Sequence, residues 1–182
     1  MANVVANNTD DGIAVTDFGS LNTISGNSIF ANGGLGIDLD DDGVTANDPG
    51  DFDVGTNDLQ NHPVLSSADA GTASVSGTLD GADGEEHVVE LFSSSGCDGS
   101  GQGEGEVFLG SGTVVTDGGA VAFSIPVTVG FLGGSEITAT ATNSGGSTSE
   151  LSACVTATGV PTPIFSDGFE SGDTTAWSSA VE

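Results

Sequence analysis

An acidic run between Gly36 and Leu65 holds the residues of this sequence best suited to chemistry. The run reads GIDLDDDGVTANDPGDFDVGTNDLQNHPVL, and eight aspartates lie between Asp38 and Asp58. The whole chain has 27 aspartate and glutamate residues and no lysine or arginine, which gives a formal net charge of −27. Carboxylates this close repel one another, so something other than a cationic side chain must neutralise them. A bound metal ion is the first interpretation.

The first half of this run matches a calcium-loop pattern. Residues 38–43, DLDDDG, fit D-x-[DN]-x-[DN]-G, in which alternate oxygens converge on a hard cation and glycine allows a sharp turn. Position twelve is Pro49 instead of a bidentate glutamate, so the run is not an EF-hand. Other oxygens can complete a Ca²⁺ site, because calcium needs no fixed ligand order. The predicted metal ligands are Asp38, Asp40, Asp42, Asn47, Asp48, Asp51 and Asp53.

Turn formation is the alternative interpretation of the same residues. Aspartate and asparagine side chains bond to nearby backbone groups in Asx turns, and their carboxylates are then solvated and neutralised by diffuse counterions. Both interpretations make residues 41–63 a connector between two domains.

The missing cations exclude two classes of partner. Nucleic acids and anionic membranes are bound through lysine and arginine, which this chain lacks. High salt or a calcium-rich extracellular setting each explain a surface without cations. The N-terminal sequence MANVVANNTDDG has no signal-peptide pattern. Because the first residues begin in the middle of a repeat, we expect the C-terminal part of a longer secreted or cell-surface protein.

A repeat of 24 residues covers the N-terminal segment. Residues 3–15, NVVANNTDDGIAV, align with residues 27–39, NSIFANGGLGIDL. Apolar residues two apart supply the inward face of short strands, and asparagine and glycine occupy the corners. This pattern resembles the final coils of a right-handed parallel β-helix, the repeat of pectate-lyase-like and many bacterial surface proteins. The resemblance implies that upstream coils stack on residues 1–40; the alternative is a pair of unrelated β-hairpins.

The pattern changes after Pro63 to alternating strands separated by turns. Seven short strands predict an immunoglobulin-like or fibronectin-III-like antiparallel β-sandwich over residues 64–158. The fold class is therefore all-β, with parallel coils followed by a sandwich. The predicted strands are 64–68, 73–79, 87–93, 107–116, 120–126, 135–142 and 148–156.

The two cysteines of the chain both fall in the predicted sandwich. Cys97 lies in the loop SGCDGSGQGEGE and Cys154 in the last predicted strand, facing away from Leu151, Ala153 and Val155. A disulfide between them would tie the glycine-rich loop to the sheet. The alternative is two free thiols in a reducing cytosol. The loop and the Ser-Ala-Cys-Val strand resemble the Ig-like module that follows β-helices in bacterial surface proteins.

A linker and a tail make up residues 159–182. The segment IFSDGFESGDTTAWS resembles a C-terminal phrase of secreted bacterial proteins, which implies a secretion or sorting signal. The alternative is an extra strand whose aromatic side chains dock on the sandwich. The positions that carry the resemblance are Phe165, Gly168, Phe169, Glu170, Gly172, Asp173 and Trp177.

Catalysis is not expected from this sequence. β-Helix lyases abstract a proton with a basic residue, and the chain has no lysine or arginine. His62 and His87 are predicted to be surface or junction residues. The predicted function is a non-enzymatic structural or adhesion-type protein with glycan or cell-surface contacts, stiffened by Ca²⁺ at the connector. The alternative is the accessory C-terminal region of a polysaccharide-degrading β-helix enzyme whose catalytic coils lie upstream.

Overall fold

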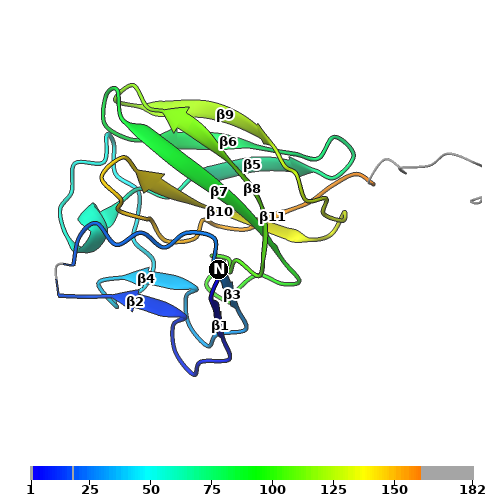
Figure 1. The fold of residues 1–182 in the computed structure, drawn as a ribbon, viewed down its shortest axis with the longest axis horizontal. Helices are drawn as coiled ribbons and strands as arrows, with labels where there is room; N and C mark the ends of the chain where they lie inside the picture. The colour runs from blue at the N-terminus through cyan, green and yellow to red at the C-terminus, as the bar shows by residue number, and fades with distance from the viewer. Residues whose placement is uncertain (1, 18, 161–182) are drawn as a thin grey trace, which may run out of the picture.

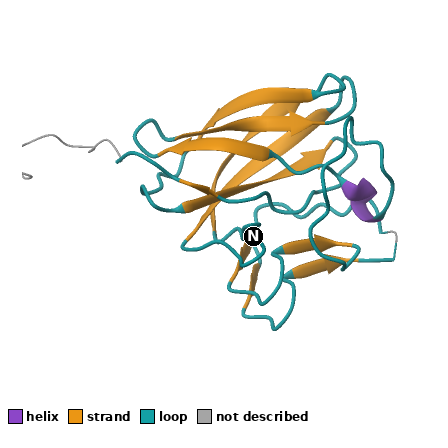
Figure 2. Ribbon diagram, turned by 180° about the vertical axis from the view of Figure 1, so that it is seen from behind, coloured by secondary structure: helices purple, strands orange, loops and turns teal. Residues whose placement is uncertain are grey.

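The computed structural model of the protein describes residues 2–17 and 19–160, and these residues form an all-β structure. Two parallel strand pairs lie against a larger body of antiparallel strands (Figure 1). Among the described residues there is one helical element, the short 3₁₀ turn η1 (Thr56–Leu59), which lies beside the sheets in Figure 2. The predicted tail motif at residues 165–177 lies outside the described residues.

The N-terminal strands pair in parallel with an offset of one repeat. Val5 of β1 lies opposite Ile29 of β3, and Ile13 of β2 lies opposite Ile37 of β4. These registers confirm the 24-residue alignment. They also overturn the alternative of unrelated hairpins, because hairpin strands are antiparallel. The bounds are β1 (Val4–Ala6), β2 (Ile13–Val15), β3 (Ser28–Phe30) and β4 (Ile37–Leu39).

Asparagines at the corners stack in the same register. The Asn3 side chain donates to Asn27 Oδ1 at 3.0 Å, and the Asn8 side chain donates to Asn32 Oδ1 at 2.9 Å. Each pair is separated by 24 residues, so equivalent side chains of the two repeats meet. The repeat therefore fixes both the strand register and the corner contacts.

The antiparallel strands form a sheet of three strands and a sheet of four. The first has the order β5-β6-β9 and the second the order β11-β10-β7-β8. Six of the seven predicted strands are confirmed to within about two residues. The bounds are β5 (Val64–Asp69), β6 (Ser74–Asp80), β7 (Glu86–Ser94), β8 (Val107–Val115), β9 (Ala120–Pro126), β10 (Glu136–Asn143) and β11 (Val155–Thr156).

A single apolar cluster lies between these two sheets. Val75 and Leu79 from the three-stranded sheet pack in the same cluster as Val89, Leu91 and Ile137 from the four-stranded sheet, and all five side chains are at most 1% exposed. The two sheets therefore share one core, as the alternation of apolar and hydroxyl residues predicts.

The seventh predicted strand, 148–156, is wrong over most of its length. Regular pairing is limited to β11, because two serine hydroxyls replace carbonyls as acceptors for the edge of β10. Ala139 N donates to Ser152 Oγ at 3.0 Å, and Ala141 N donates to Ser149 Oγ at 2.9 Å. The predicted shared face is also wrong, since Leu151 is 2% exposed while Ala153 is exposed.

A second apolar cluster joins the parallel pairs to the antiparallel body. Ile29, Ile37 and Leu39 of the parallel strands pack with Phe92 of β7 and Leu151. The approach at Gly36 is so close that a Cβ there would lie 2.6 Å from Leu151 Cδ1. The parallel strands therefore dock directly on the four-stranded sheet.

Candidate metal centre at the connector

Residues 41–63, in cyan in Figure 1, run along the side of the molecule from β4 to β5. Asn47 closes this connector near its ends: its side-chain amide donates to His62 O at 2.8 Å, and His62 N donates to Asn47 Oδ1 at 2.9 Å. The Asn61 side chain likewise donates to Asp48 O at 2.8 Å. The acidic run therefore folds back on itself, which brings its aspartates together.

Asp48, Asp51 and Asp53 form the connector cluster. One carboxylate oxygen from each lies within 4.8 Å of the others, as the ligands of one ion would. Asp48 Oδ1 and Asp53 Oδ1 are buried and accept no hydrogen bond. Buried oxygens without a donor carry a cost of about 1–3 kcal/mol each. An arrangement of this kind can hold a metal ion.

Asp51 is the central residue of this cluster. Its two oxygens accept hydrogen bonds from Asn61 N at 2.8 Å and from the Gln60 side chain at 2.7 Å. Burial, together with repulsion from Asp53 and Asp48, raises the pKa of Asp51 to about 7. Burial also raises the pKa of Asp53. A cation beside these carboxylates would favour their charged forms, and so offset the effects of burial and of mutual repulsion.

Asp38 belongs to a different cluster, with Asp11 and Asp41. Asp38 is 3% exposed, and its oxygens accept hydrogen bonds from Asp42 N at 3.2 Å and Gly43 N at 3.0 Å. These bonds are those of an Asx turn. Desolvation, with repulsion from its two acidic neighbours, still raises the pKa of Asp38.

The remaining three predicted ligands lie in neither cluster. Asp40 accepts a hydrogen bond from the Thr56 hydroxyl, and the side chain of Asp42 is exposed. Asn47 uses both atoms of its amide on the main chain of His62. The structure thus distributes the seven predicted residues over several places and brings together three of them, Asp48, Asp51 and Asp53.

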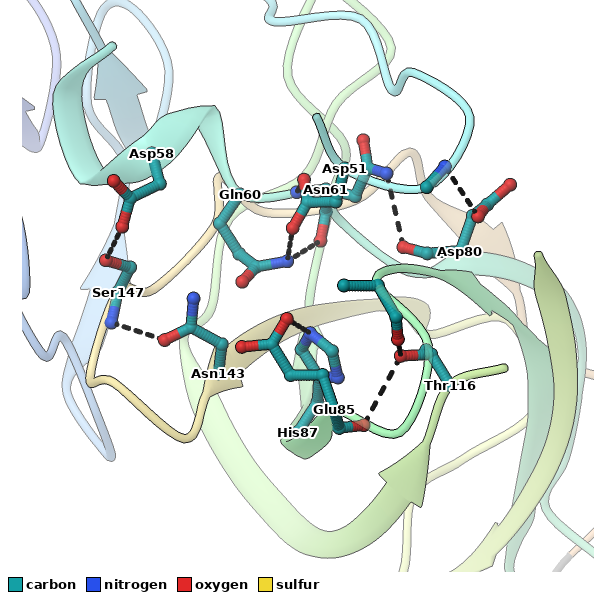
Figure 3. Close-up of polar contacts among 12 residues, drawn as sticks. Asp51, Asp58, Gln60, Asn61, Asp80, Glu85, His87, Thr116, Asn143 and Ser147 are labelled. Atoms are coloured by element: carbon teal, nitrogen blue, oxygen red, sulfur yellow. Dashed lines mark hydrogen bonds and ion pairs between the residues drawn. The ribbon is translucent and has the colours of Figure 1, made fainter. Parts of the chain in front are cut away.

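Sequence reasoning missed two residues beside the connector cluster, Glu85 and His87. One ligand atom of each lies within 4.8 Å of a carboxylate oxygen of Asp51 (Figure 3). His87 is predicted to be a surface or junction residue; it is 0% exposed and therefore not a surface residue, and it lies where β7 meets the connector. Period-two alternation in β7 could have found it, since His87 shares its face with Val89 and Leu91. His62 does lie at the junction, where burial lowers its pKa.

Three glutamates of the antiparallel body bond to the parallel strands and their corners; we call Glu90, Glu104 and Glu150 the coil cap. Glu104 accepts from Ala31 N at 2.6 Å and from Asn32 N at 2.8 Å. Glu90 accepts from Gly26 N at 3.1 Å and from the hydroxyl of Ser25 at 2.9 Å.

Glu150 is the most buried member of the coil cap, with 1% exposure. It accepts from Leu39 N at 3.1 Å, and from the main chain and hydroxyl of Thr45 at 3.0 and 2.9 Å. Desolvation raises its pKa, although these hydrogen bonds favour the charged form. The last repeat therefore ends on carboxylates that are satisfied by N–H and O–H donors.

The predicted disulfide between Cys97 and Cys154 is confirmed, with a Cα–Cα distance of 6.1 Å. It ties the loop that carries Glu104 to the segment before β11. In the same loop, Gly105 forms a reciprocal main-chain pair with Ile29, each hydrogen bond measuring 2.9 Å. The disulfide points to an oxidising environment.

A scan against protein-family models and a search of curated proteins gave no match for this chain. Within residues 2–17 and 19–160, no helix has the length and apolar character needed to cross a membrane.

Proposed function

We propose that this chain is a non-enzymatic structural or adhesion-type β-protein that closes one end of a parallel β-helix in a secreted or cell-surface protein. In this proposal the parallel strands are terminal coils, the antiparallel body is an Ig-like module, and Ca²⁺ stiffens the connector. Upstream coils of a longer chain are the main partner, with glycan or cell-surface contacts beyond them.

The observation that carries the proposal is the difference between the two edges of the parallel pairs. On one edge, β3 bonds to Gly105 and the end of β4 bonds to Glu150. On the other edge, β1 and β2 have no further strand partner among the described residues, and Val4 is 70% exposed. An open edge beside a covered one suits the terminal unit of a stacked array, which needs a cap of different composition.

The strand order supports an Ig-like module. If the seven strands are lettered A, B, C, C′, E, F and G in chain order, the two sheets read A-B-E and G-F-C-C′. Immunoglobulin-like and fibronectin-III-like domains build their larger sheet around G-F-C, and variable-type domains extend it with C′.

The connector cluster supports the choice of calcium. Its ligand atoms are carboxylate oxygens, which Ca²⁺ prefers, and main-chain carbonyls of a folded loop can complete six to eight ligands. Calcium binding would hold the loop between β4 and β5, and thereby the angle between coils and module.

Calorimetric titration of the metal-free protein tests the calcium component. We expect a saturable heat with Ca²⁺ and a higher melting temperature than matched ionic strength of a monovalent salt gives. Asp53→Asn should weaken Ca²⁺ binding at least about 10-fold, whereas Asp42→Asn, an exposed aspartate of the same connector, should leave it within about 2-fold. Equal effects of the two variants, or no saturable heat, would remove calcium from the proposal.

Incubation of the purified protein with uronate and neutral polysaccharides tests the structural role. The proposal predicts no new reducing ends and no unsaturated products. Turnover of any of these polymers would contradict it.

A further inference from the structure

Beside the connector cluster, the strand β7 and the loop before it present a different set of ligands. His87 lies in β7, Glu85 comes just before that strand, and Asp51 faces both from the connector. The three ligand atoms lie within 4.8 Å of one another. In Figure 3, Asp51 and Gln60 of the connector lie opposite Glu85 and His87.

The imidazole of His87 is the feature that sets this group apart from an ordinary acidic cluster. The side chain is 0% exposed, yet neither ring nitrogen has a hydrogen-bond partner. A buried polar group without a partner costs stability, so a well-packed neutral histidine here lacks a structural reason. One ring nitrogen of His87 lies within 4.8 Å of carboxylate oxygens of Asp51 and Glu85, and imidazole nitrogen and carboxylate oxygen are both ligands of Zn²⁺.

The separation of the ligand atoms agrees with this interpretation. His87 Nε2 lies 3.9 Å from Glu85 Oε2, too far for a hydrogen bond. Two ligands of one ion, each about 2.0–2.2 Å from the metal, can be up to about 4 Å apart. The distance is therefore compatible with a shared ion, and a protonated His87 would form an ion pair with Glu85 at the same distance.

Gln60 lies next to Asp51 and carries an oxygen without a hydrogen-bond partner. Its side-chain nitrogen donates to Asp51 Oδ2 at 2.7 Å, and its Oε1 is buried without a donor. Gln60 is 2% exposed, so this oxygen has little access to bulk water. The hydrogen bonds from Gln60 and Asn61 also orient the Asp51 carboxylate, as outer partners of metal ligands do.

We propose that Asp51, Glu85 and His87 form a site for a first-row transition-metal ion such as Zn²⁺, with Gln60 Oε1 or water as a fourth ligand. One imidazole with two carboxylates favours this class of ion, whereas Ca²⁺ and Mg²⁺ prefer oxygen ligands throughout. The ion would fasten the connector to β7 of the four-stranded sheet. Glu85, whose side chain is 25% exposed, leaves a path for the ion to enter.

This site has a different ligand set from the calcium proposal, although the two overlap at Asp51. It shares Asp51 with the connector cluster but takes its remaining ligands from Glu85 and His87 instead of Asp48 and Asp53. Loss of His87 should therefore abolish the Zn²⁺ response and keep the Ca²⁺ response, and loss of Asp53 should do the reverse.

Titration of the metal-free protein with Zn²⁺, and with Co²⁺ as a visible spectroscopic probe, tests the site in a buffer with excess Mg²⁺. We expect 1:1 Zn²⁺ binding that Mg²⁺ does not prevent. We also expect Co²⁺ absorption bands typical of a four- or five-coordinate ion with nitrogen and oxygen ligands. His87→Leu should weaken Zn²⁺ binding at least about 100-fold and remove the Co²⁺ bands, since even loss of an outer partner costs about 10–100-fold.

Two further variants keep this test decisive. His62→Gln, at the other histidine of the chain, should bind Zn²⁺ within about 2-fold of the wild type. Glu85→Gln, a partly exposed position, should weaken binding at least about 10-fold and serves if His87→Leu does not fold. Zn²⁺ binding that survives both His87→Leu and Glu85→Gln, that is lost in His62→Gln, or that excess Mg²⁺ abolishes would overturn the proposal.

Discussion

The coil cap and the connector cluster differ in how completely their carboxylate oxygens are hydrogen-bonded. Glu150 is 1% exposed and its two oxygens accept three hydrogen bonds from Leu39 and Thr45. In the connector cluster, Asp48 Oδ1 and Asp53 Oδ1 are buried with no donor. Both regions belong to a chain without lysine or arginine, so the difference lies in the local supply of N–H and O–H donors.

The ends of strands β3 and β4 provide hydrogen-bond donors at the coil cap. Beyond β3 and β4 no further strand of the described residues pairs with their main-chain N–H groups, and carboxylates that accept these groups gain charge-assisted hydrogen bonds. In the connector, main-chain and amide donors are already paired, as Asn47 with His62 and Asn61 with Asp48 illustrate. Asp48 Oδ1 and Asp53 Oδ1 are left without such a donor, and a bound cation is the compensation that our proposal assigns to them. Under our proposal, this chain without basic residues compensates its acids by N–H and O–H donors at the coil cap and by an ion at the connector.

The largest effect on the coil cap should come from loss of the disulfide. The bridge spans 57 residues and ties down the loop that carries Glu104. Cys97→Ser with Cys154→Ser should lower the free energy of unfolding by about 4 kcal/mol on the chain-entropy estimate. Urea denaturation of the variant and of the reduced wild type measures it. Equal stability of the oxidised and reduced proteins would show that the loop is held without the bridge.

Removal of the Glu150 side chain should give the next largest loss of stability. Glu150→Ala leaves Leu39 N without an acceptor, and Leu39 is 0% exposed. The loss should be about 3 kcal/mol, the upper end for a buried unpaired donor. Glu86→Ala, at an exposed glutamate of β7, is the control and should change stability by less than about 0.5 kcal/mol. Similar losses in both variants would mean that net charge matters and capping does not.

A negative charge introduced beside Glu104 should also destabilise the coil cap. The Asn32 side chain donates to Glu104 Oε1 at 3.1 Å, so Asn32→Asp replaces this donor with a second carboxylate. We expect a loss of about 2 kcal/mol, from the bond to a charged group. Asn27→Asp changes a different corner of the same repeat, where Asn27 Oδ1 accepts from Asn3, and should cost less. Thermal unfolding of the two variants at low salt measures the two losses of stability. A larger loss of stability in Asn27→Asp than in Asn32→Asp would contradict the role of Glu104 in the coil cap.

The smallest effect should be on the pH dependence of stability. Burial raises the pKa of Glu150 in the folded state, so folding favours its protonated form. The stability that this provides is fully present below the unfolded pKa of glutamate, about 4.3, and is lost as pH rises through the folded pKa. Metal-free wild type should therefore gain more stability than Glu150→Gln when the pH falls from 7 toward 4. Parallel pH profiles from denaturant titrations would exclude this role.

The strands of this fold could be predicted because each pattern is local. The 24-residue repeat gave the register of Ile13 with Ile37, and alternation gave six antiparallel strands. The segment 148–156 failed because serine hydroxyls there substitute for main-chain acceptors, which no alternation records.

The candidate sites were harder to predict because they depend on contacts between distant segments. Charge density identified the connector, and Asp48, Asp51 and Asp53 do meet there. Glu85 and His87 reach Asp51 only because β7 lies beside the folded connector, and the coil cap depends on how Glu104 and Glu150 meet the last repeat. Neighbouring positions in the sequence do not show which distant segments come into contact.

Amide hydrogen exchange of the metal-free protein, with and without Ca²⁺, tests the contrast between the two regions most directly. Phe52 N and Asn61 N donate to Asp48 and Asp51 of the connector cluster, while Leu39 N and Asn32 N donate to the coil cap. We expect Ca²⁺ to slow exchange at Phe52 and Asn61 at least about 10-fold and to leave Leu39 and Asn32 unchanged. Equal slowing in both regions, or none in the connector, would contradict the assignment of ions to one region and backbone donors to the other.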